Sequence, residues 1–316
     1  MIVVTLPATT PPSIAITGAS GLIGRALTGR LKERGFTVIR LVRGAAAAAD
    51  EAAWSPAGGL LESERLAGVA AVIHLAGENI GAARWTRRRM AAIWSSRIDA
   101  TRALASSLVR LTPSPAAFLC ASAVGIYGDS GDEVLDEASP PGRGFLPELC
   151  QAWEAAARID GVRVVNLRFG VVLSAAGGML AKLLTPFRLG LGGPVGSGRQ
   201  YLSWISLADA VAAVEHALAN EAVRGPVNVV APEPVTNAEF TRGLAHELHR
   251  PAFFRVPAFA LRLALGRMAD EAILASTRAT PAALARSGFG FRFPRLAAAL
   301  RAATALPRSA NASASG

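Results

Sequence analysis

Three glycines spaced three residues apart, in the segment TGASGLIG at residues 17–24, constrain this chain more than any other feature. A β-branched run at residues 13–17 precedes them, and a helix-like segment at 21–34 follows. In such a unit Gly18 permits the tight turn, Gly21 lets the backbone approach a pyrophosphate, and Gly24 lets the helix pack closely on the strand. An empty glycine-rich turn would carry the same triplet. The second apolar strand at residues 36–42 completes the context that a dinucleotide-binding unit requires, and we therefore expect one here.

Apolar strands alternate with helical segments through the rest of the first two thirds of the chain. Near-continuous apolar runs at residues 69–75 and 116–121, with a further core strand at 162–167, are typical of parallel strands that are covered on both faces. We expect an α/β fold, a Rossmann-type doubly wound parallel sheet with a small, mostly helical C-terminal substrate lobe. The expected units are an NADP-binding domain at 13–175 with 207–230, a smaller lobe at 176–206 with 231–303, and flexible termini at 1–12 and 304–316.

Two further segments have a pattern of their own. Residues 86–110 read as one long helical stretch, and the glycine-dense residues 177–198 predict a loop with little regular structure. The later part of that loop, residues 190–198, could close over a substrate or simply connect surface elements.

The composition argues against several classes of protein. No apolar run approaches the ~18 to 20 residues of a membrane span, and the N-terminus lacks a basic leader, so we expect a cytoplasmic protein with no membrane partner. Cys120 and Cys150 lack metal-site spacing and are expected to be ordinary buried thiols, with no metal bound. The net charge of +10 comes from scattered arginines without interleaved aromatic residues, so no nucleic-acid partner is expected. A monomer and a homodimer are equally compatible with the sequence.

The second strand distinguishes between the two nicotinamide cofactors. An NAD site places an acid near its end to bind the ribose 2′-hydroxyl, whereas an arginine there accommodates the 2′-phosphate of NADP. Here Val42 and Arg43 follow the strand, and no acid precedes Asp50. Because a guanidinium pairs with phosphate through charge-assisted hydrogen bonds, the sequence predicts NADP(H).

A catalytic pair common in proteins of this architecture is missing. The chain has two tyrosines, Tyr127 and Tyr201, and neither is followed four residues later by lysine. Nevertheless, a set of motifs between residues 13 and 301 resembles the YfcH-type epimerase family, an atypical extended short-chain dehydrogenase/reductase group of the NAD-dependent epimerase/dehydratase type. These motifs are TGASGLIG (17–24), HLAGENI (74–80), RWT (84–86), SSRI (95–98), SAVGIYG (122–128), FLPELCQAWEAAA (145–157), PFRLGLGGPVGSG (186–198) and SWI (203–205).

The resemblance implies positions for the cofactor and for the missing groups. By comparison with extended members, the Tyr-x-x-x-Lys positions are Leu149 and Trp153, and the usual Ser or Thr position is Ala123, beside Ser122. The implied cofactor contacts are Gly18, Ala19, Gly21, Leu22, Ile23 and Gly24 at the pyrophosphate, Arg43 at the 2′-phosphate, Leu75, Ala76 and Gly77 beneath a ribose, Arg97 toward the phosphates, and the segment from Arg168 to Val171 near the nicotinamide. Relatives often carry a hydroxyl residue at the position of Val42.

Hydride chemistry needs a group that exchanges a proton near the nicotinamide. Tyr127 and Glu78 follow strand ends, where open α/β sheets bind ligands, and are the catalytic candidates. Tyr127 could instead be hydrogen-bonded at the floor of the cleft, and Glu78 could cap its loop with Asn79. We expect an NADP(H)-binding oxidoreductase or epimerase-like protein acting on an unidentified small molecule. The alternative is a non-catalytic NADP(H)-binding sensor or scaffold.

Overall fold

An eight-stranded sheet forms the centre of the computed structural model, which describes residues 12–56 and 60–305. Seven neighbouring strands run parallel. In spatial order they are β12 (Gly225–Val229), β8 (Arg163–Phe169), β6 (Ala117–Ala123), β5 (Ala71–His74), β1 (Ser13–Thr17), β2 (Thr37–Val42) and β3 (Glu51–Ser55), with β4 (Leu60–Leu61) antiparallel to β3. From β1, the strands β2 and β3 follow toward one edge of the sheet, whereas the later strands β5, β6, β8 and β12 lie toward the other edge. This is the doubly wound arrangement, so the predicted fold class is confirmed.

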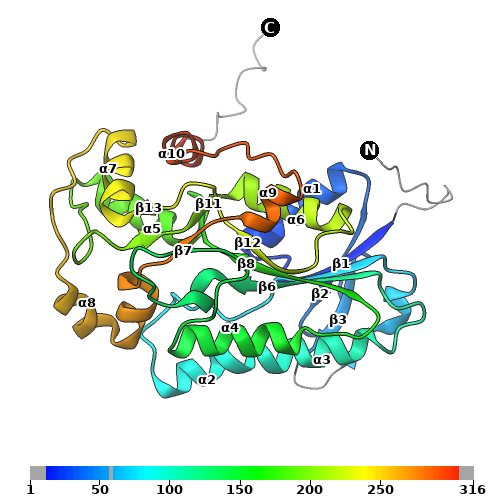
Figure 1. Ribbon diagram of the computed structural model, residues 1–316. Helices are drawn as coiled ribbons and strands as arrows, with labels where there is room; N and C mark the ends of the chain where they lie inside the picture. The colour runs from blue at the N-terminus through cyan, green and yellow to red at the C-terminus, as the bar shows by residue number, and fades with distance from the viewer. Residues whose placement is uncertain (1–11, 57–59, 306–316) are drawn as a thin grey trace, which may run out of the picture.

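Helices cover both faces of the sheet (Figure 1). One face packs against α1 (Leu22–Glu33) and α6 (Leu207–Ala219), whose buried residues Leu27, Leu31 and Val214 join Ile14 and Ile16 in one core cluster. The other face packs against α3 (Ile98–Leu108) and α4 (Phe145–Ala156), with α2 (Arg87–Ser95) alongside. Burial on both faces explains why the central strands β1, β5 and β6 consist mostly of apolar residues.

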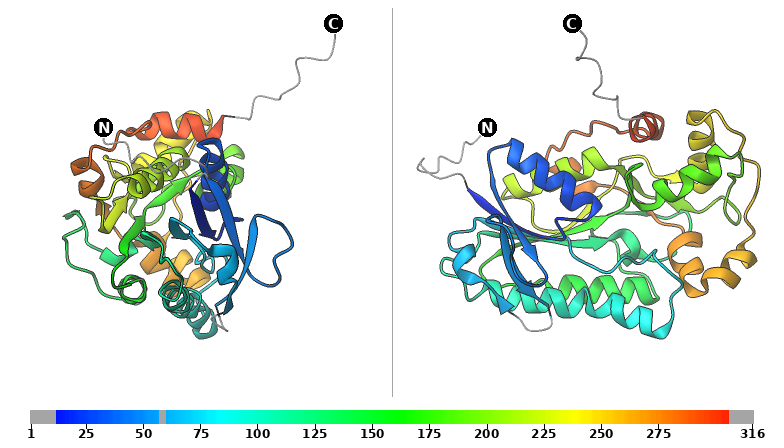
Figure 2. Two further views of the ribbon diagram at one scale, coloured as in Figure 1. Left: turned by 90° about the vertical axis from the view of Figure 1, so that its right-hand side faces the viewer. Right: turned by 180° about the vertical axis from the view of Figure 1, so that it is seen from behind.

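The C-terminal segment is mostly helical. Its elements are α7 (Asn237–Glu247), α8 (Ala258–Leu265), η3 (Ala269–Leu274), α9 (Ala282–Arg286) and α10 (Leu296–Thr304). Figure 2 shows α8 and η3 beside the start of α4, where the Glu271 carboxylate accepts a hydrogen bond from the backbone N–H of Leu146 at 2.9 Å. The remaining short strands and turns are β7 (Val134–Leu135), β9 (Val171–Leu173), β10 (Tyr201–Leu202), β11 (Trp204–Ser206), β13 (Val235–Thr236), β14 (Arg278–Ala279), η1 (Ser63–Leu66) and η2 (Val124–Tyr127). The proposed boundary between two domains stays a prediction, and the predicted flexible termini lie almost wholly outside the described residues.

Two segment predictions are wrong. The expected helix at 86–110 is divided into α2 and α3 at Ser96 and Arg97, where the Ser96 hydroxyl donates to the carbonyl of Ile93 at 3.0 Å. Such a local side-chain bond to the preceding turn bends helices. The expected loop at 177–198 contains the helix α5 (Gly178–Arg188), because Leu180, Leu184 and Phe187 recur at helical spacing and are buried together.

Both cysteines are free and buried, as predicted. Within residues 12–56 and 60–305, no helix is both long and apolar enough to cross a bilayer.

Candidate functional site

The glycine turn lies at the carboxyl end of β1, next to the carboxyl end of β5. Gly18 has a φ of +69°, and a Cβ on it would lie 2.8 Å from the backbone nitrogen of Ala76. A Cβ on Gly24 would lie only 2.1 Å from the carbonyl oxygen of Gly18. The turn, the first turn of α1 and the end of β5 are therefore packed backbone to backbone, as the sequence pattern requires. Ala19 takes part in the same packing, half-buried against the sheet core.

The N-terminus of α1 is free to receive an anion. Gly21 is its N-cap residue and supplies no side-chain cap, and the first turn, which begins with Leu22 and Ile23, contains no acid. By contrast, α6 and α7 are capped by the hydroxyls of Ser206 and Thr236. An uncapped helix start leaves N–H donors unsatisfied at the positive end of the helix dipole, which is the arrangement that binds phosphate.

Thr17 and His74 connect the ends of β1 and β5. The Thr17 hydroxyl oxygen accepts hydrogen bonds from the N–H groups of Leu75 and Ala76 at 3.1 and 3.2 Å, and it lies 2.6 Å from Nδ1 of His74. Because the oxygen already accepts twice, its own proton is available for the bond to Nδ1 of the imidazole. Full burial, with Arg97 nearby, lowers the pKa of His74 to about 3. The neutral ring thus holds the backbone from Leu75 to Ala76 against the glycine turn.

Arg97 lies just beyond this backbone. A Cβ on Gly77 would be 3.2 Å from the guanidinium carbon of Arg97, and that carbon lies 5.0 Å from the ring centre of Trp153. Burial lowers the pKa of Arg97. Its hydrogen bonds reach only the Ile93 carbonyl at 3.3 Å and the Ser96 hydroxyl at 3.4 Å, and no carboxylate of the described residues forms an ion pair with it. A half-buried, partly desolvated cation without an ion-pair partner is costly, so this position favours an anion.

Arg43 and Asp50 differ in what surrounds them. Arg43 is exposed directly after β2, and in the part of the chain that the structure describes it forms no hydrogen bond or ion pair. Asp50 is held by Arg40 at 2.9 Å and Lys32 at 3.0 Å. The hydrogen bond from Arg40, followed by that from Lys32, lowers the pKa of Asp50 to about 2. The first acid after β2 is therefore already neutralised, whereas the arginine is free.

A buried polar network occupies the carboxyl ends of β6, β8 and β12. Arg168 donates to both carboxylate oxygens of Glu154, at 2.7 and 2.9 Å, and the Ser122 hydroxyl donates to the same carboxylate at 2.8 Å. Arg168 also donates to the Tyr127 hydroxyl at 2.9 Å, and that hydroxyl donates to Asn228 Oδ1 at 2.7 Å. Burial acts to lower the pKa of Arg168, but its bonds to Glu154 outweigh burial and raise it. Arg168 is therefore a fixed cation at this edge.

The two catalytic candidates occupy different environments. Tyr127 is 2% exposed, both roles of its hydroxyl are taken by Asn228 and Arg168, and burial raises its pKa. Glu78 follows β5, its side chain is 41% exposed, and it forms an ion pair with Arg89. Its backbone N–H donates to the Ser96 hydroxyl at 3.1 Å. A group that transfers protons must reach its substrate, and of the two only Glu78 has this access in the described structure.

Apolar side chains occupy the two positions at which the family resemblance places the Tyr and the Lys, an assignment that stays a prediction. Leu149 is 2% exposed in the cluster with Trp85 and Phe145, and Trp153 is 5% exposed with its indole N–H donating to Thr101 at 2.9 Å. Val171 begins β9, which pairs with β11. Asn228 is a network member that sequence reasoning missed, because it lies 101 residues from its partner Tyr127 and no local pattern marks it.

Comparison with known proteins gives consistent results. The model of the family described as "NAD dependent epimerase/dehydratase family" matches residues 14–230, and a domain of unknown function matches residues 256–303. An epimerase family protein of Mycobacterium bovis is 45% identical over 297 residues, covering 93% of this chain and 98% of the relative.

Solved structures extend the comparison. The human epimerase family protein SDR39U1, crystallised with NADPH, has a TM-score of 0.86 and 35% identity, covering 92% of this chain and 98% of that one. A nucleoside-diphosphate sugar epimerase of Corynebacterium glutamicum has a TM-score of 0.76 and 37% identity, covering 93% of this chain and 58% of that one. The family resemblance drawn from the motifs is thereby confirmed, and this chain belongs to the NAD dependent epimerase/dehydratase family.

Proposed function

We propose that this chain is an NADP(H)-dependent oxidoreductase or epimerase that acts on a small molecule and works without a Tyr–Lys pair. One observation carries the proposal. The glycine turn, in which Gly18 and Gly24 have no room for a side chain, lies under an uncapped helix start. This arrangement fits a pyrophosphate that approaches the backbone closely. The human relative crystallised with NADPH supports the proposal.

The preference for NADP(H) over NAD(H) rests on charge. Arg43 is exposed and free, and a ribose 2′-phosphate gives it a partner for a charge-assisted contact. The carboxylate of Asp50 is bound by Arg40 and Lys32, so it is not free to accept a hydrogen bond from a ribose hydroxyl. A solved structure of similar fold, MoeE5 in complex with UDP-glucose and NAD, holds NAD, at 20% identity with this chain. The preference is therefore a property to be tested on this chain's own residues.

The side chains and backbone groups at the site indicate which of them would contact each part of a bound cofactor. Bound here, the nicotinamide would supply hydride transfer. We propose that the first turn of α1 and Arg97 neutralise the phosphates, with Leu75, Ala76 and Gly77 beneath a ribose. Glu78 would exchange the proton, since its carboxylate reaches solvent. Tyr127 would serve as a second candidate only if its hydroxyl left Asn228.

Replacing Arg43 tests the cofactor preference. Arg43→Ala should weaken NADPH binding about ten- to hundredfold, because a hydrogen bond to a charged group contributes ~1.5 to 3 kcal/mol. NADH binding should change less than about threefold. Arg102→Ala on α3 removes the same charge far from the glycine turn and is the matched control. Equal losses for both nucleotides would show that Arg43 is only a surface charge.

A sensor or scaffold is the second candidate, and a specific observation favours it. Leu149 and Trp153 bury apolar side chains where the family pattern has Tyr and Lys, and the Tyr127 hydroxyl is engaged on both sides. If the chain is an enzyme, it should oxidise NADPH with some member of a panel of carbonyl compounds, and the rate should be at least tenfold lower in Glu78→Gln. If the chain is a sensor or scaffold, it should bind NADPH without turnover across the panel, and its association with a partner should change when NADPH is added.

A further inference from the structure

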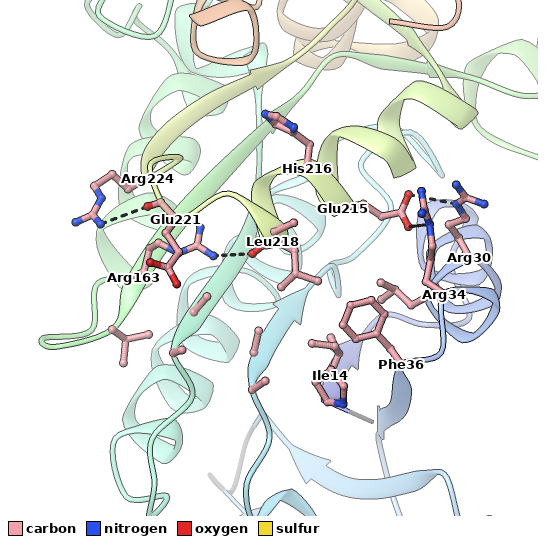
Figure 3. A pocket seen from close by; sticks show the side chains of 18 of the residues that line it. Ile14, Arg30, Arg34, Phe36, Arg163, Glu215, His216, Leu218, Glu221 and Arg224 are labelled. Atoms are coloured by element: carbon pink, nitrogen blue, oxygen red, sulfur yellow. Dashed lines mark hydrogen bonds and ion pairs between the residues drawn. The ribbon is translucent and has the colours of Figure 1, made fainter. Parts of the chain in front are cut away.

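A cavity lies at the amino ends of the parallel strands, whereas the glycine turn lies at their carboxyl ends. It has a volume of about 1220 Å³ and lies at the amino ends of four adjacent strands, β1, β5, β6 and β8 (Figure 3). Its floor is formed by Ala70 and the exposed Ala116 at the strand starts, over the almost fully buried Ile14, Ala71 and Ala117, and helix α6 contributes Leu218 to its wall. Neighbouring strands are ~4.8 Å apart, so the floor extends for ~14 Å across them. Small alanine side chains at the centre leave an elongated apolar trench.

The floor offers a ligand no polar partner. The backbone groups at the strand starts already bond to one another: Ala70 N–H to Ser13 O at 2.8 Å, Ala116 N–H to Ala70 O at 2.9 Å, and Arg163 N–H to Ala116 O at 3.2 Å. A ligand with polar edges, such as a nucleotide base, would bury those edges without hydrogen bonds, at a cost of ~1 to 3 kcal/mol each. The floor therefore favours a hydrocarbon chain.

Arginines stand at both ends of the trench (Figure 3). At one end Arg30 and Arg34 share the carboxylate of Glu215 at 3.3 and 3.6 Å, and Arg30 also pairs with Glu33 at 3.5 Å. These charges are largely balanced. This end is therefore the weaker candidate for an anion.

At the other end the charges are less balanced. The Arg163 guanidinium donates to the carbonyl oxygens of Ala217, Leu218 and Val223 at 2.8 to 2.9 Å. Arg224 is exposed and donates to the Glu221 carbonyl at 3.3 Å. No carboxylate of the described residues lies within ion-pair distance of either arginine, although Glu221 is close enough to act on Arg163 electrostatically.

We propose that this trench binds an unbranched aliphatic carboxylate, a fatty acid anion of medium chain length. Its chain would lie along the strand starts, and its carboxylate would be held by the exposed Arg224, with the positive charge of Arg163 nearby while its guanidinium stays bonded to the carbonyls at the end of α6. The site is separate from the glycine turn, because the two lie at opposite ends of the same strands. The proposal therefore does not depend on the proposed cofactor chemistry.

Calorimetry on the full chain tests the proposal, with sodium dodecanoate as the probe at concentrations below its micelle threshold. Saturable binding is expected. Arg224→Ala should weaken it about tenfold, equivalent to ~1.4 kcal/mol. Ala116→Leu should abolish it, because this exposed residue lines the trench and a larger side chain would fill it without changing the charge. Arg102→Ala, which removes the same charge on the other face of the sheet, should leave it unchanged.

Several results would overturn the proposal. They are absence of binding, equal binding of dodecyltrimethylammonium, and full binding by Ala116→Leu. Binding that appears only after removal of residues 1–11, which precede the trench residue Pro12, would also overturn it. NADPH affinity and melting temperature, measured on every variant, separate a local effect from misfolding. Loss of NADPH binding alone would count against the proposed cofactor site and not against this trench.

Discussion

Gly24 offers a sharp test of the glycine turn, because the same helix carries a matched control. Both Gly24 and Gly29 lie within α1. A Cβ on Gly24 would lie 2.1 Å from the carbonyl oxygen of Gly18 and 2.8 Å from the Cα of Ala19, both backbone atoms that cannot rotate away. A Cβ on Gly29 would meet nothing within 4 Å. The two substitutions to alanine therefore differ only in what the added methyl group meets.

The structure sets the expected magnitudes. Real Cβ contacts stay above 3.0 Å, so Gly24→Ala must open the gap from 2.1 Å by about 0.9 Å. Overpacking of this kind costs ~1 to 3 kcal/mol, partly offset by the ~1 kcal/mol that alanine gains over glycine within a helix. Gly29→Ala gains this helix-propensity energy without any overpacking cost. The displacement at Gly24 also moves the first turn of α1 away from a bound pyrophosphate, so NADPH affinity should fall at least tenfold.

Two measurements on each variant test whether the close contact at Gly24 is needed for stability and for NADPH binding. Urea unfolding should show Gly29→Ala equal to or more stable than the parent and Gly24→Ala up to about 2 kcal/mol less stable. Calorimetry should show unchanged NADPH affinity for Gly29→Ala and a large loss for Gly24→Ala. If Gly24→Ala bound NADPH as tightly as the parent, the close approach of turn and helix would not be needed for the cofactor, and the argument from the glycine spacing would fail.

Two further predictions concern buried charge. Glu154→Gln should destabilise the chain by ~3 to 5 kcal/mol in urea unfolding, because it leaves Arg168 buried without its carboxylate; a change below about 1 kcal/mol would contradict this. Burial lowers the pKa of His74 to about 3 from its ordinary 6.5, so the unfolded chain binds the proton more readily between these values and stability must fall as the pH drops through them. At about pH 4.5 the loss from His74 should be about 3 kcal/mol. Unfolding in a His216→Gln background removes the contribution of His216, whose pKa burial lowers as well, and a flat profile would refute the assignment.

The sequence predicts well those elements whose pattern is local. The predicted helix at 21–34 corresponds to α1, and the expected apolar strands correspond to β5, β6 and β8 with boundaries shifted by one or two residues. Strand β3 at Glu51–Ser55 was missed, because EAAWS is short and follows an alanine tract. Helix α5 was missed because the flanking glycines conceal an apolar repeat that becomes decisive only when it packs into a core.

The candidate site likewise has features that can be predicted from local sequence and features that depend on the folded sheet. The glycine turn and the arginine after β2 can be read from spacing, because the residues involved are neighbours in the chain. The network that joins Tyr127, Arg168 and Asn228 depends on strands that meet only in the folded sheet. The separation of Tyr127 from solvent is likewise a tertiary property that a count of tyrosines does not reveal.

Calorimetric titration of the unmodified chain with NADPH and with NADH is the decisive experiment for the proposed cofactor site. Saturable binding of NADPH is expected, with NADH bound at least tenfold more weakly because it lacks the phosphate that Arg43 would contact. Absence of binding by either nucleotide at micromolar to millimolar concentrations would contradict the account.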